Sequence, residues 1–207
     1  MPSEPRPTPP PSEWRRIGVF GGTFDPPHVG HLVTAVNVRH TLDLDVVLLV
    51  VAGDPWQKSH RELTPAADRL AMVEAAVGDV AGLEASDLEL QRPGRSYTAD
   101  TLAGLRRLHP GAELVLVLGS DAAAGLPTWD RVDEVRELAS IVVVTRPGSE
   151  EGRPPPGWAW DAVETPRLDV SSTDLRDRVA DGRPLDYLLT SAVLDCIEAR
   201  GLYRSPE

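Results

Sequence analysis

Short, continuous apolar runs that alternate with helical segments constrain the fold of this chain more than any other feature of its sequence. The four runs span Arg16 to Phe20, Val46 to Ala52, Glu113 to Leu118 and Ile141 to Val144. A run without polar alternation is typical of a strand that is buried on both faces. Strands that alternate with helices imply βαβ units with right-handed crossovers. The sequence therefore predicts an α/β fold, with a doubly wound, mainly parallel sheet flanked by helices.

Helical spacing and capping residues mark the segments between these runs. The predicted helices cover about His28 to Leu42, Thr64 to Val77, Thr98 to Leu105, Val132 to Leu138, Ser171 to Ala180 and Thr190 to Arg200. Thr64 and Thr98 are predicted N-caps, because a threonine hydroxyl can accept a hydrogen bond from the first turn. Gly201 is well placed to end the last helix. A doubly wound sheet binds its ligand at the carboxyl ends of the strands, so motifs that follow a strand are candidate site residues.

Length and composition favour one full-sized domain preceded by a tail. The chain has 207 residues, and its first 13 are crowded with prolines. We therefore expect residues 1–14 to form a disordered, partly polyproline-like tail and residues 15–207 to form the domain. The tail lacks the apolar segment of a signal peptide. No later apolar run reaches the roughly 18 residues that a membrane span needs.

Charge and cysteine content exclude several classes of protein. The formal net charge is -11 at pH 7, which argues against a general nucleic-acid binder because a polyanion requires a basic face. Cys196 is the only cysteine, so the chain can form neither an internal disulfide nor a cysteine-based zinc site. We expect Cys196 to be a small, buried core residue on a helix. Together these features predict a cytoplasmic protein that binds neither nucleic acid nor membrane, with a homo-oligomer left open.

The first candidate motif follows the first apolar run directly. It reads Gly-Gly-Thr-Phe-Asp-Pro-Pro-His-Val-Gly-His-Leu over residues 21–32. The glycines allow a sharp turn close to a ligand, and the motif has neither the G-x-G-x-x-G spacing nor the lysine of a P-loop. His28 and His31 would share one face at a helix start, where both can donate hydrogen bonds and carry charge near neutral pH. With the N–H groups of that helix start, they predict an anion site. From the residues alone, structural histidines or a metal site with Asp25 remain open.

The second candidate motif is Val-Ser-Ser-Thr-Asp-Leu-Arg over residues 170–176. Its plain interpretation is a helix cap, because Ser171 and Asp174 come close to a capping box. Its functional interpretation is a phosphate site at a helix N-terminus. There the hydroxyls of Ser172 and Thr173 and the forked guanidinium of Arg176 would face one anion.

The two motifs together resemble the H-x-G-H and S-[ST]-[ST]-x-[IV]-R signatures of the nucleotidylyltransferase superfamily, with Leu175 at the position that is usually β-branched. The resemblance implies the Rossmann-like nucleotidylyltransferase fold and ATP as a substrate. It implies catalytic roles for His28, His31 and Arg176. The ATP-binding residues that it implies are Gly22, Thr23, Phe24, His31, Gly119, Asp121, Ser172, Thr173 and Arg176.

Four further segments are similar to those of the bacterial nicotinate-nucleotide adenylyltransferases, and the resemblance runs from Arg16 to Tyr203. The segments are Gly-Asp-Pro-Trp-Gln-Lys (53–58), Ser-Tyr-Thr-Ala-Asp-Thr-Leu (96–102), Gly-Ser-Asp (119–121) followed by Leu126 and Trp129, and the ending Gly-Leu-Tyr (201–203). The resemblance implies that Lys58, Thr98, Trp129 and Arg146 bind the pyridine nucleotide.

These residues also have ordinary structural interpretations. Lys58 could be a solvated charge, and Asp121 could be a turn residue. Thr98 could serve only as a helix cap. Trp129 could pack in the core, although a flat ring near a pyridine site could also stack on the nicotinate ring. Departures from the usual family residues bear on the choice of acceptor; they are Ala52, Ser120 and Pro127-Thr128.

The resemblance implies direct attack by the phosphate of nicotinate mononucleotide on the α-phosphorus of ATP, with no covalent enzyme intermediate. Mg²⁺ would travel with ATP, because the sequence offers no dedicated carboxylate cage. Alternatives remain. The same chemistry could use nicotinamide mononucleotide or phosphopantetheine. The chain could also be a non-catalytic nucleotide sensor, or a metal-dependent hydrolase that uses Asp25, His28 and His31.

Overall fold

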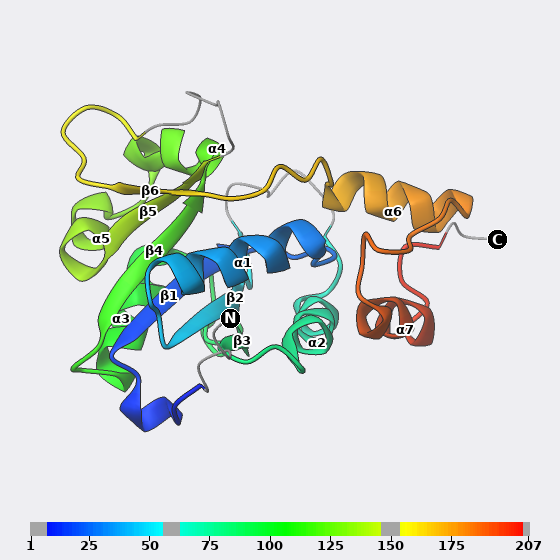
Figure 1. The fold of residues 1–207 in the computed structure, drawn as a ribbon, viewed down its shortest axis with the longest axis horizontal. Helices are drawn as coiled ribbons and strands as arrows, with labels where there is room; N and C mark the ends of the chain where they lie inside the picture. Colours follow the sequence, from blue (N-terminus) through cyan, green and yellow to red (C-terminus); the bar gives the residue numbers. More distant parts are fainter. Residues whose placement is uncertain (1–7, 56–62, 146–153, 205–207) are drawn as a thin grey trace, which may run out of the picture.

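The computed structural model describes residues 8–55, 63–145 and 154–204. Their strands are β1 (Arg16–Gly22), β2 (Val46–Val51), β3 (Leu83–Ser86), β4 (Glu113–Gly119), β5 (Ser140–Thr145) and β6 (Asp161–Glu164). These strands form one sheet in the order β3-β2-β1-β4-β5-β6, and every pairing between them is parallel (Figure 1). The predicted doubly wound, parallel sheet is confirmed.

Strand β2 shows why its sequence is apolar throughout. Successive side chains of a strand point to opposite faces of the sheet. Val47, Leu49 and Val51 enter the core on one face of the sheet. The remaining residues of the strand, Val46, Leu48 and Val50, enter the core on the other face. Both cores therefore need apolar side chains from the same strand, which removes the polar alternation that a half-exposed strand would have.

Helices cover both faces of the sheet. The core on one face receives buried residues from α1 (Val29–Thr41), α2 (Ala66–Val77), α6 (Ser172–Asp181) and α7 (Ser191–Ala199). The core on the other face receives them from α3 (Thr98–Leu108), α4 (Ser120–Ala124) and α5 (Val132–Leu138). In Figure 1, α6 and α7 lie at the end of the molecule beside α2, away from α3 and α5. The chain from the second motif to the C-terminus therefore packs on the α2 side.

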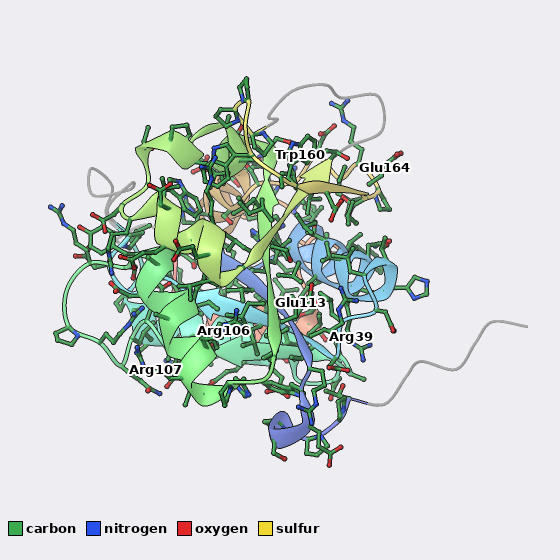
Figure 2. All side chains as sticks on the ribbon, turned by 90° about the vertical axis from the view of Figure 1, so that its left-hand side faces the viewer. Arg39, Arg106, Arg107, Glu113, Trp160 and Glu164 are labelled. Atoms are coloured by element: carbon green, nitrogen blue, oxygen red, sulfur yellow. The ribbon has the colours of Figure 1, made fainter. Side chains whose placement is uncertain are left out.

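The two edge strands were not among the predicted strands. β3 reads Leu-Glu-Ala-Ser and β6 reads Asp-Ala-Val-Glu, and each has only four residues. An edge strand is short and partly exposed, so it carries polar side chains and lacks a continuous apolar run. Figure 2 labels Glu164 at the end of β6, with Trp160 just before the strand. Charged side chains at this edge oppose pairing with another strand.

Of the four serine or threonine residues that begin predicted helices, two are the N-cap of their helix and two are not. Ser171 caps α6 and Thr190 caps α7, each by accepting a hydrogen bond from the backbone N–H three residues on. Thr98 is the first helical residue of α3, so Tyr97 is the N-cap and the predicted cap is wrong. A residue that already has helical dihedral angles cannot be the N-cap. Helix α2 starts at Ala66 with Pro65 in the extended N-cap position, which leaves Thr64 one residue too early.

Trp14 belongs to the core, although the predicted tail includes it. Its side chain is 6% exposed and its indole N–H donates to the carbonyl of Pro9, 2.9 Å away. A 3-10 helix, Pro11–Glu13, leads into it. The proline content of this region therefore places the end of the tail too late, because Trp14 already packs in the core.

Two predictions from composition can be compared with the structure. Cys196 lies on α7 as predicted, but it is half-buried rather than fully buried. Among the helices of the described residues, none is both long and apolar enough to cross a membrane.

Candidate active site

The topological switch point of the sheet lies between β1 and β4. From β1 the sheet continues through β2 to β3, and from β4 it continues through β5 to β6. Each of these two central strands ends in a glycine, Gly22 and Gly119. Two clefts open at these carboxyl ends and share both glycines, together with Thr23 and Asp121. A doubly wound fold binds its ligands at this place.

Both sequence motifs meet in one of these clefts, which we call the histidine cleft. Its volume is about 700 Å³. Every residue predicted to bind ATP or to act in catalysis lines it: Gly22, Thr23, Phe24, His28, His31, Gly119, Asp121, Ser172, Thr173 and Arg176. Residues from positions 22 to 176 of the chain are thus brought to one surface, as the position of the motifs after their strands predicted.

His28 and His31 form a stacked pair at the start of α1. Their ring centroids are 3.7 Å apart with an interplanar angle of 28°. His28 is the N-cap residue, and its backbone N–H donates to Nδ1 of His31 at 3.2 Å. An Nδ1 that accepts this bond carries no proton, so a neutral His31 has its proton on Nε2. Phe24 also packs edge-on against His31, with centroids 5.0 Å apart, and so gives that ring a second aromatic contact.

His28 is buried and uncharged near neutral pH. It is 8% exposed, and its Nδ1 has no hydrogen-bond partner among the described residues. Burial lowers the pKa of His28 to about 4, because desolvation disfavours the imidazolium. Both histidines were expected to be able to carry charge near neutral pH, and burial opposes this for His28. His28 is thus a neutral side chain with one unpaired polar atom beside the cleft.

The second motif is bonded directly to the first. Ser172 Oγ donates to the carbonyl oxygen of Pro26 at 2.9 Å. Arg176 Nη1 donates to the carbonyl oxygen of Asp25 at 2.5 Å, and its Nη2 donates to Thr173 Oγ1 at 3.3 Å. Helix α6 thereby fixes the loop between β1 and α1. The cap interpretation of this motif and its anion interpretation are both compatible with the structure, because Ser171 performs the capping and the residues after it line the cleft.

The loop after β1 has an uncommon backbone conformation. Phe24 has φ 49°, in the left-handed region that non-glycine residues seldom occupy. Its ring folds back over Gly22, where an added Cβ would lie 2.8 Å from Phe24 Cζ. A glycine at position 22 is therefore required by the packing of Phe24.

The carboxylate of Asp25 is occupied by hydrogen bonds within the protein. It is 2% exposed, its Oδ1 accepts a hydrogen bond from Tyr203 Oη at 2.7 Å and its Oδ2 accepts one from the backbone N–H of Thr64 at 3.3 Å. Within the described residues, no group of three or more His, Cys, Asp and Glu side chains is arranged to hold a metal ion. The arrangement does not favour a metal centre of Asp25, His28 and His31.

The second cleft, which we call the tryptophan cleft, lies between α3 and the 3-10 helix Leu126–Thr128. Its volume is about 730 Å³, and it is lined by Thr98 and Trp129. No side chain caps α3 at Tyr97, so the N–H groups of its first turn lack the partner that a capping side chain provides. Arg131 joins the two walls of this cleft through an ion pair with Asp100, with 2.7 Å between Nη2 and Oδ2.

Lys58 and Arg146, which the sequence also assigned to the pyridine nucleotide, lie outside the described residues. Two functional candidates were missed. Ser96 Oγ accepts hydrogen bonds from the backbone N–H groups of Gly53 and Asp54, which ties two segments of the tryptophan cleft together. Arg69 is 1% exposed and holds backbone carbonyls behind the histidine cleft. An arginine in a helical pattern reads as a solvated residue, so no local signal marks Arg69 as buried.

Sequence comparisons match nearly the whole chain. A model of the cytidylyltransferase-like family matches residues 19–178. The chain is 45% identical over 197 residues to the "Probable nicotinate-nucleotide adenylyltransferase" of Saccharopolyspora erythraea, covering 95% of this chain and 93% of that protein. It is 47% identical over 197 residues to the protein of the same name from a Roseiflexus species, covering 91% of this chain and 98% of that protein.

Structure comparison gives the same fold. The Plasmodium falciparum nicotinic acid mononucleotide adenylyltransferase complexed with NaAD superposes with a TM-score of 0.74 at 19% identity, covering 91% of this chain and 97% of that chain. At this level of identity the similarity concerns the fold.

Proposed function

We propose that this chain, which belongs to the family of nicotinate-nucleotide adenylyltransferases, transfers the adenylyl group of ATP to the phosphate of nicotinate mononucleotide. The products are nicotinate adenine dinucleotide and pyrophosphate, and the reaction serves NAD biosynthesis. One observation carries the assignment of the site: the histidine cleft and the tryptophan cleft adjoin at Gly22, Thr23, Gly119 and Asp121. Two nucleotides that enter from either side would bring their phosphates together at this wall, which is the alignment that phosphoryl chemistry needs.

ATP binds in the histidine cleft. His28 and His31 hold oxygens of the α- and β-phosphates. The start of α6, with Ser172 and Thr173, binds the leaving pyrophosphate together with Arg176. Two donors of the Arg176 guanidinium are used by the carbonyl oxygen of Asp25 and by Thr173, and an arginine has five, so donors remain for phosphate oxygens. Asp121 lies on the adenosine side.

Catalysis consists of alignment and charge stabilisation. The attacking phosphate is already ionised, so the reaction needs no general base and no nucleophile from the protein. Oriented donors stabilise the charge that develops on the transferred group. A phosphate beside His28 would raise the pKa of its imidazole, which burial has lowered, because a nearby negative charge favours the imidazolium. ATP would thus supply the partner that His28 lacks among the described residues.

The pyridine nucleotide binds in the tryptophan cleft. Trp129 stacks on the nicotinate ring, and the exposed N–H groups of the first turn of α3, at Thr98, bind its carboxylate. Lys58 contacts the phosphate, and Arg146 contacts the nucleotide edge. The absence of a side-chain cap at Tyr97 supports the carboxylate site, since a capping side chain would compete for the same N–H groups.

Mg²⁺ enters with ATP as part of the substrate. Nucleotidyltransferases generally use a divalent metal ion with their nucleotide. A Mg²⁺ ion usually keeps several waters and binds substrate phosphates with one or two carboxylates. This fits a chain in which the described residues contain no group of three or more potential metal ligands.

The first experiment measures pyrophosphate release from ATP and Mg²⁺, with nicotinate mononucleotide and nicotinamide mononucleotide as parallel acceptors. We expect a strong preference for the acid, because the amide offers no charge to the N–H groups of α3. His31→Ala should lower kcat by about 10²-fold or more while the fold survives, since it removes a donor that acts in the transition state.

The outcomes separate the alternatives. Equal use of both acceptors would preserve the chemistry and contradict the acid preference. Near-normal kcat in His31→Ala would contradict the role of that residue. No release with either acceptor, from folded protein that binds ATP, would contradict the pyridine assignment and favour another phosphate acceptor or a nucleotide sensor.

A further inference from the structure

The loop between β1 and α1 needs support from outside itself. Phe24 is fully buried and has φ 49°. A bulky non-glycine residue persists in this conformation only where the surrounding structure holds it there. Thr23 and Phe24 both line the histidine cleft, so whatever holds Phe24 also sets the geometry of the proposed ATP site.

Asp25, the next residue, is where most of that support converges. Its carbonyl oxygen accepts from Arg176 of the second motif. Its carboxylate is buried and accepts from Tyr203 Oη at 2.7 Å and from the Thr64 backbone N–H at 3.3 Å. A buried carboxylate depends on such donors, because burial without them is strongly unfavourable. Removing one donor should therefore release the carboxylate and, with it, the loop.

Arg69 forms the rear of the same cluster. It is 1% exposed and donates to the carbonyl oxygens of Thr64 at 2.8 Å and Thr23 at 2.9 Å. Its positive charge lies near Asp25 and Tyr203. The cluster therefore links helix α2, the loop that lines the proposed ATP site and the C-terminal segment.

Tyr203 comes from the far end of the chain, beyond α7. It has φ 61°, again in the left-handed region. The hydrogen bond from Tyr203 to Asp25 thus joins one residue with a positive φ to the neighbour of another, Phe24. Burial and the bond to Asp25 raise the pKa of Tyr203 well above its ordinary value, so the phenol keeps its proton and remains a donor.

We propose that Tyr203 is a positioning residue for adenylyl transfer, which acts through Asp25 on the loop that lines the histidine cleft. The inference rests on the proposed function of that cleft. Tyr203 does not touch the substrates in this role. Its hydroxyl holds the Asp25 carboxylate, which holds Phe24 in its strained conformation and Thr23 at the shared wall of the two clefts. A small displacement at a site that works by alignment reduces turnover.

The same chain offers a matched control at Arg200. Arg200 Nη1 bonds to Asp68 Oδ1 at 2.5 Å. Like Tyr203, this ion pair fastens the segment after α7 to the rest of the molecule, in this case to α2. Arg200 is not among the residues that line either cleft, and its ion pair with Asp68 does not involve Asp25. Arg200→Gln therefore loosens the C-terminal segment without removing a donor from Asp25.

The test compares Tyr203→Phe with Arg200→Gln at a temperature well below both unfolding transitions. Tyr203→Phe keeps the ring and removes only the hydroxyl. We expect it to lower kcat about tenfold and to weaken MgATP binding about threefold or more, whereas Arg200→Gln changes both by less than about twofold. The KM for nicotinate mononucleotide should change less than kcat, since Thr98 and Trp129 are not held by Asp25.

Two measurements keep the result independent of the proposed function. Pyrophosphate release by the wild-type protein tests that function by itself. Calorimetric binding of MgATP needs no acceptor, so it tests the role of Tyr203 even if nicotinate mononucleotide is not the substrate. Wild-type ATP affinity in Tyr203→Phe, or equal losses in the two variants, would overturn the proposal, because the contact would then only dock the C-terminus.

Discussion

At the scale of single residues, His28 combines burial with an unpaired polar atom. Its ring is stacked on His31, its Nδ1 has no partner among the described residues and burial lowers its pKa to about 4. An unpaired buried polar atom is costly to stability. Such a cost is typical of binding sites, where a ligand supplies the missing partner.

His28 should make the folding stability depend on pH. Its pKa is about 4 when folded and about 6.5 when unfolded. The unfolded chain therefore binds the proton more tightly between these values, so stability is complete above pH 6.5 and is lost as pH falls towards 4. We expect His28→Asn to reduce this acid-induced loss in the free energy of unfolding by up to about 3 kcal/mol.

Denaturant unfolding of the wild type and His28→Asn at pH 7 and pH 4.5 measures this difference. His40→Asn, at the exposed C-terminal end of α1, is the matched control for replacing a histidine of the same helix. If the free energy of unfolding changed equally with pH in His28→Asn and in the wild type, His28 would be solvated in the folded protein.

At the scale of elements, the start of helix α6 has two roles: one residue caps the helix, and the residues after it line the histidine cleft. Ser171 Oγ accepts from the Asp174 backbone N–H at 3.2 Å and so caps the helix. Ser172, Thr173 and Arg176 then line the histidine cleft. The capping residue thus orients the N–H groups and side chains that we propose for the pyrophosphate.

Ser171→Ala should therefore reduce both stability and the affinity for MgATP. Loss of an N-cap costs about 1 kcal/mol. Thr190→Ala removes the equivalent cap from α7, which does not line either cleft, and should cost about the same stability. Thermal unfolding and the KM for ATP, measured on both variants, separate the two effects: only Ser171→Ala should raise the KM. A raised KM in Thr190→Ala as well would indicate a general loss of rigidity instead.

At the scale of the whole molecule, the two clefts adjoin at the switch point, where α4 lines both, and they differ in the other helices that line them. The histidine cleft uses α1 and α6, and the tryptophan cleft uses α3 and the segment at Trp129. Ligands that bind the folded state raise its stability, by about 2.7 kcal/mol at one hundred times Kd. The stabilisation that each ligand produces should therefore depend on the residues of the cleft that binds it.

Trp129→Ala should lose the rise in unfolding temperature that nicotinate mononucleotide produces, and should keep the rise that MgATP produces. Arg176→Met should show the reverse pattern. Differential scanning fluorimetry with each ligand alone gives all four values. If both ligands lost their effect in both variants, the assignment of one nucleotide to each cleft would be wrong.

Much of this molecule could be predicted from local sequence. The four central strands follow from their apolar runs, because burial on both faces requires apolar residues at every position. The first motif could be assigned to the carboxyl end of a strand, because it follows the first apolar run directly, whereas the second motif follows β6, which was not predicted. Ser171 and Thr190 were predictable as caps because a cap depends on residues only three positions apart.

Contacts between distant parts of the chain could not be predicted in this way. The edge strands β3 and β6 pair through backbone atoms, which any sequence possesses, and only their neighbours in the sheet select them. The depressed pKa of His28 depends on how deeply the fold buries it. The bonds of Asp25 to Tyr203 and of Arg69 to Thr23 span 178 and 46 residues. The amino-acid sequence thus determined the chemistry available and where along the chain it lies, whereas the tertiary structure decided which charges are desolvated and which residues support the site, because desolvation and hydrogen bonding depend on neighbours in space.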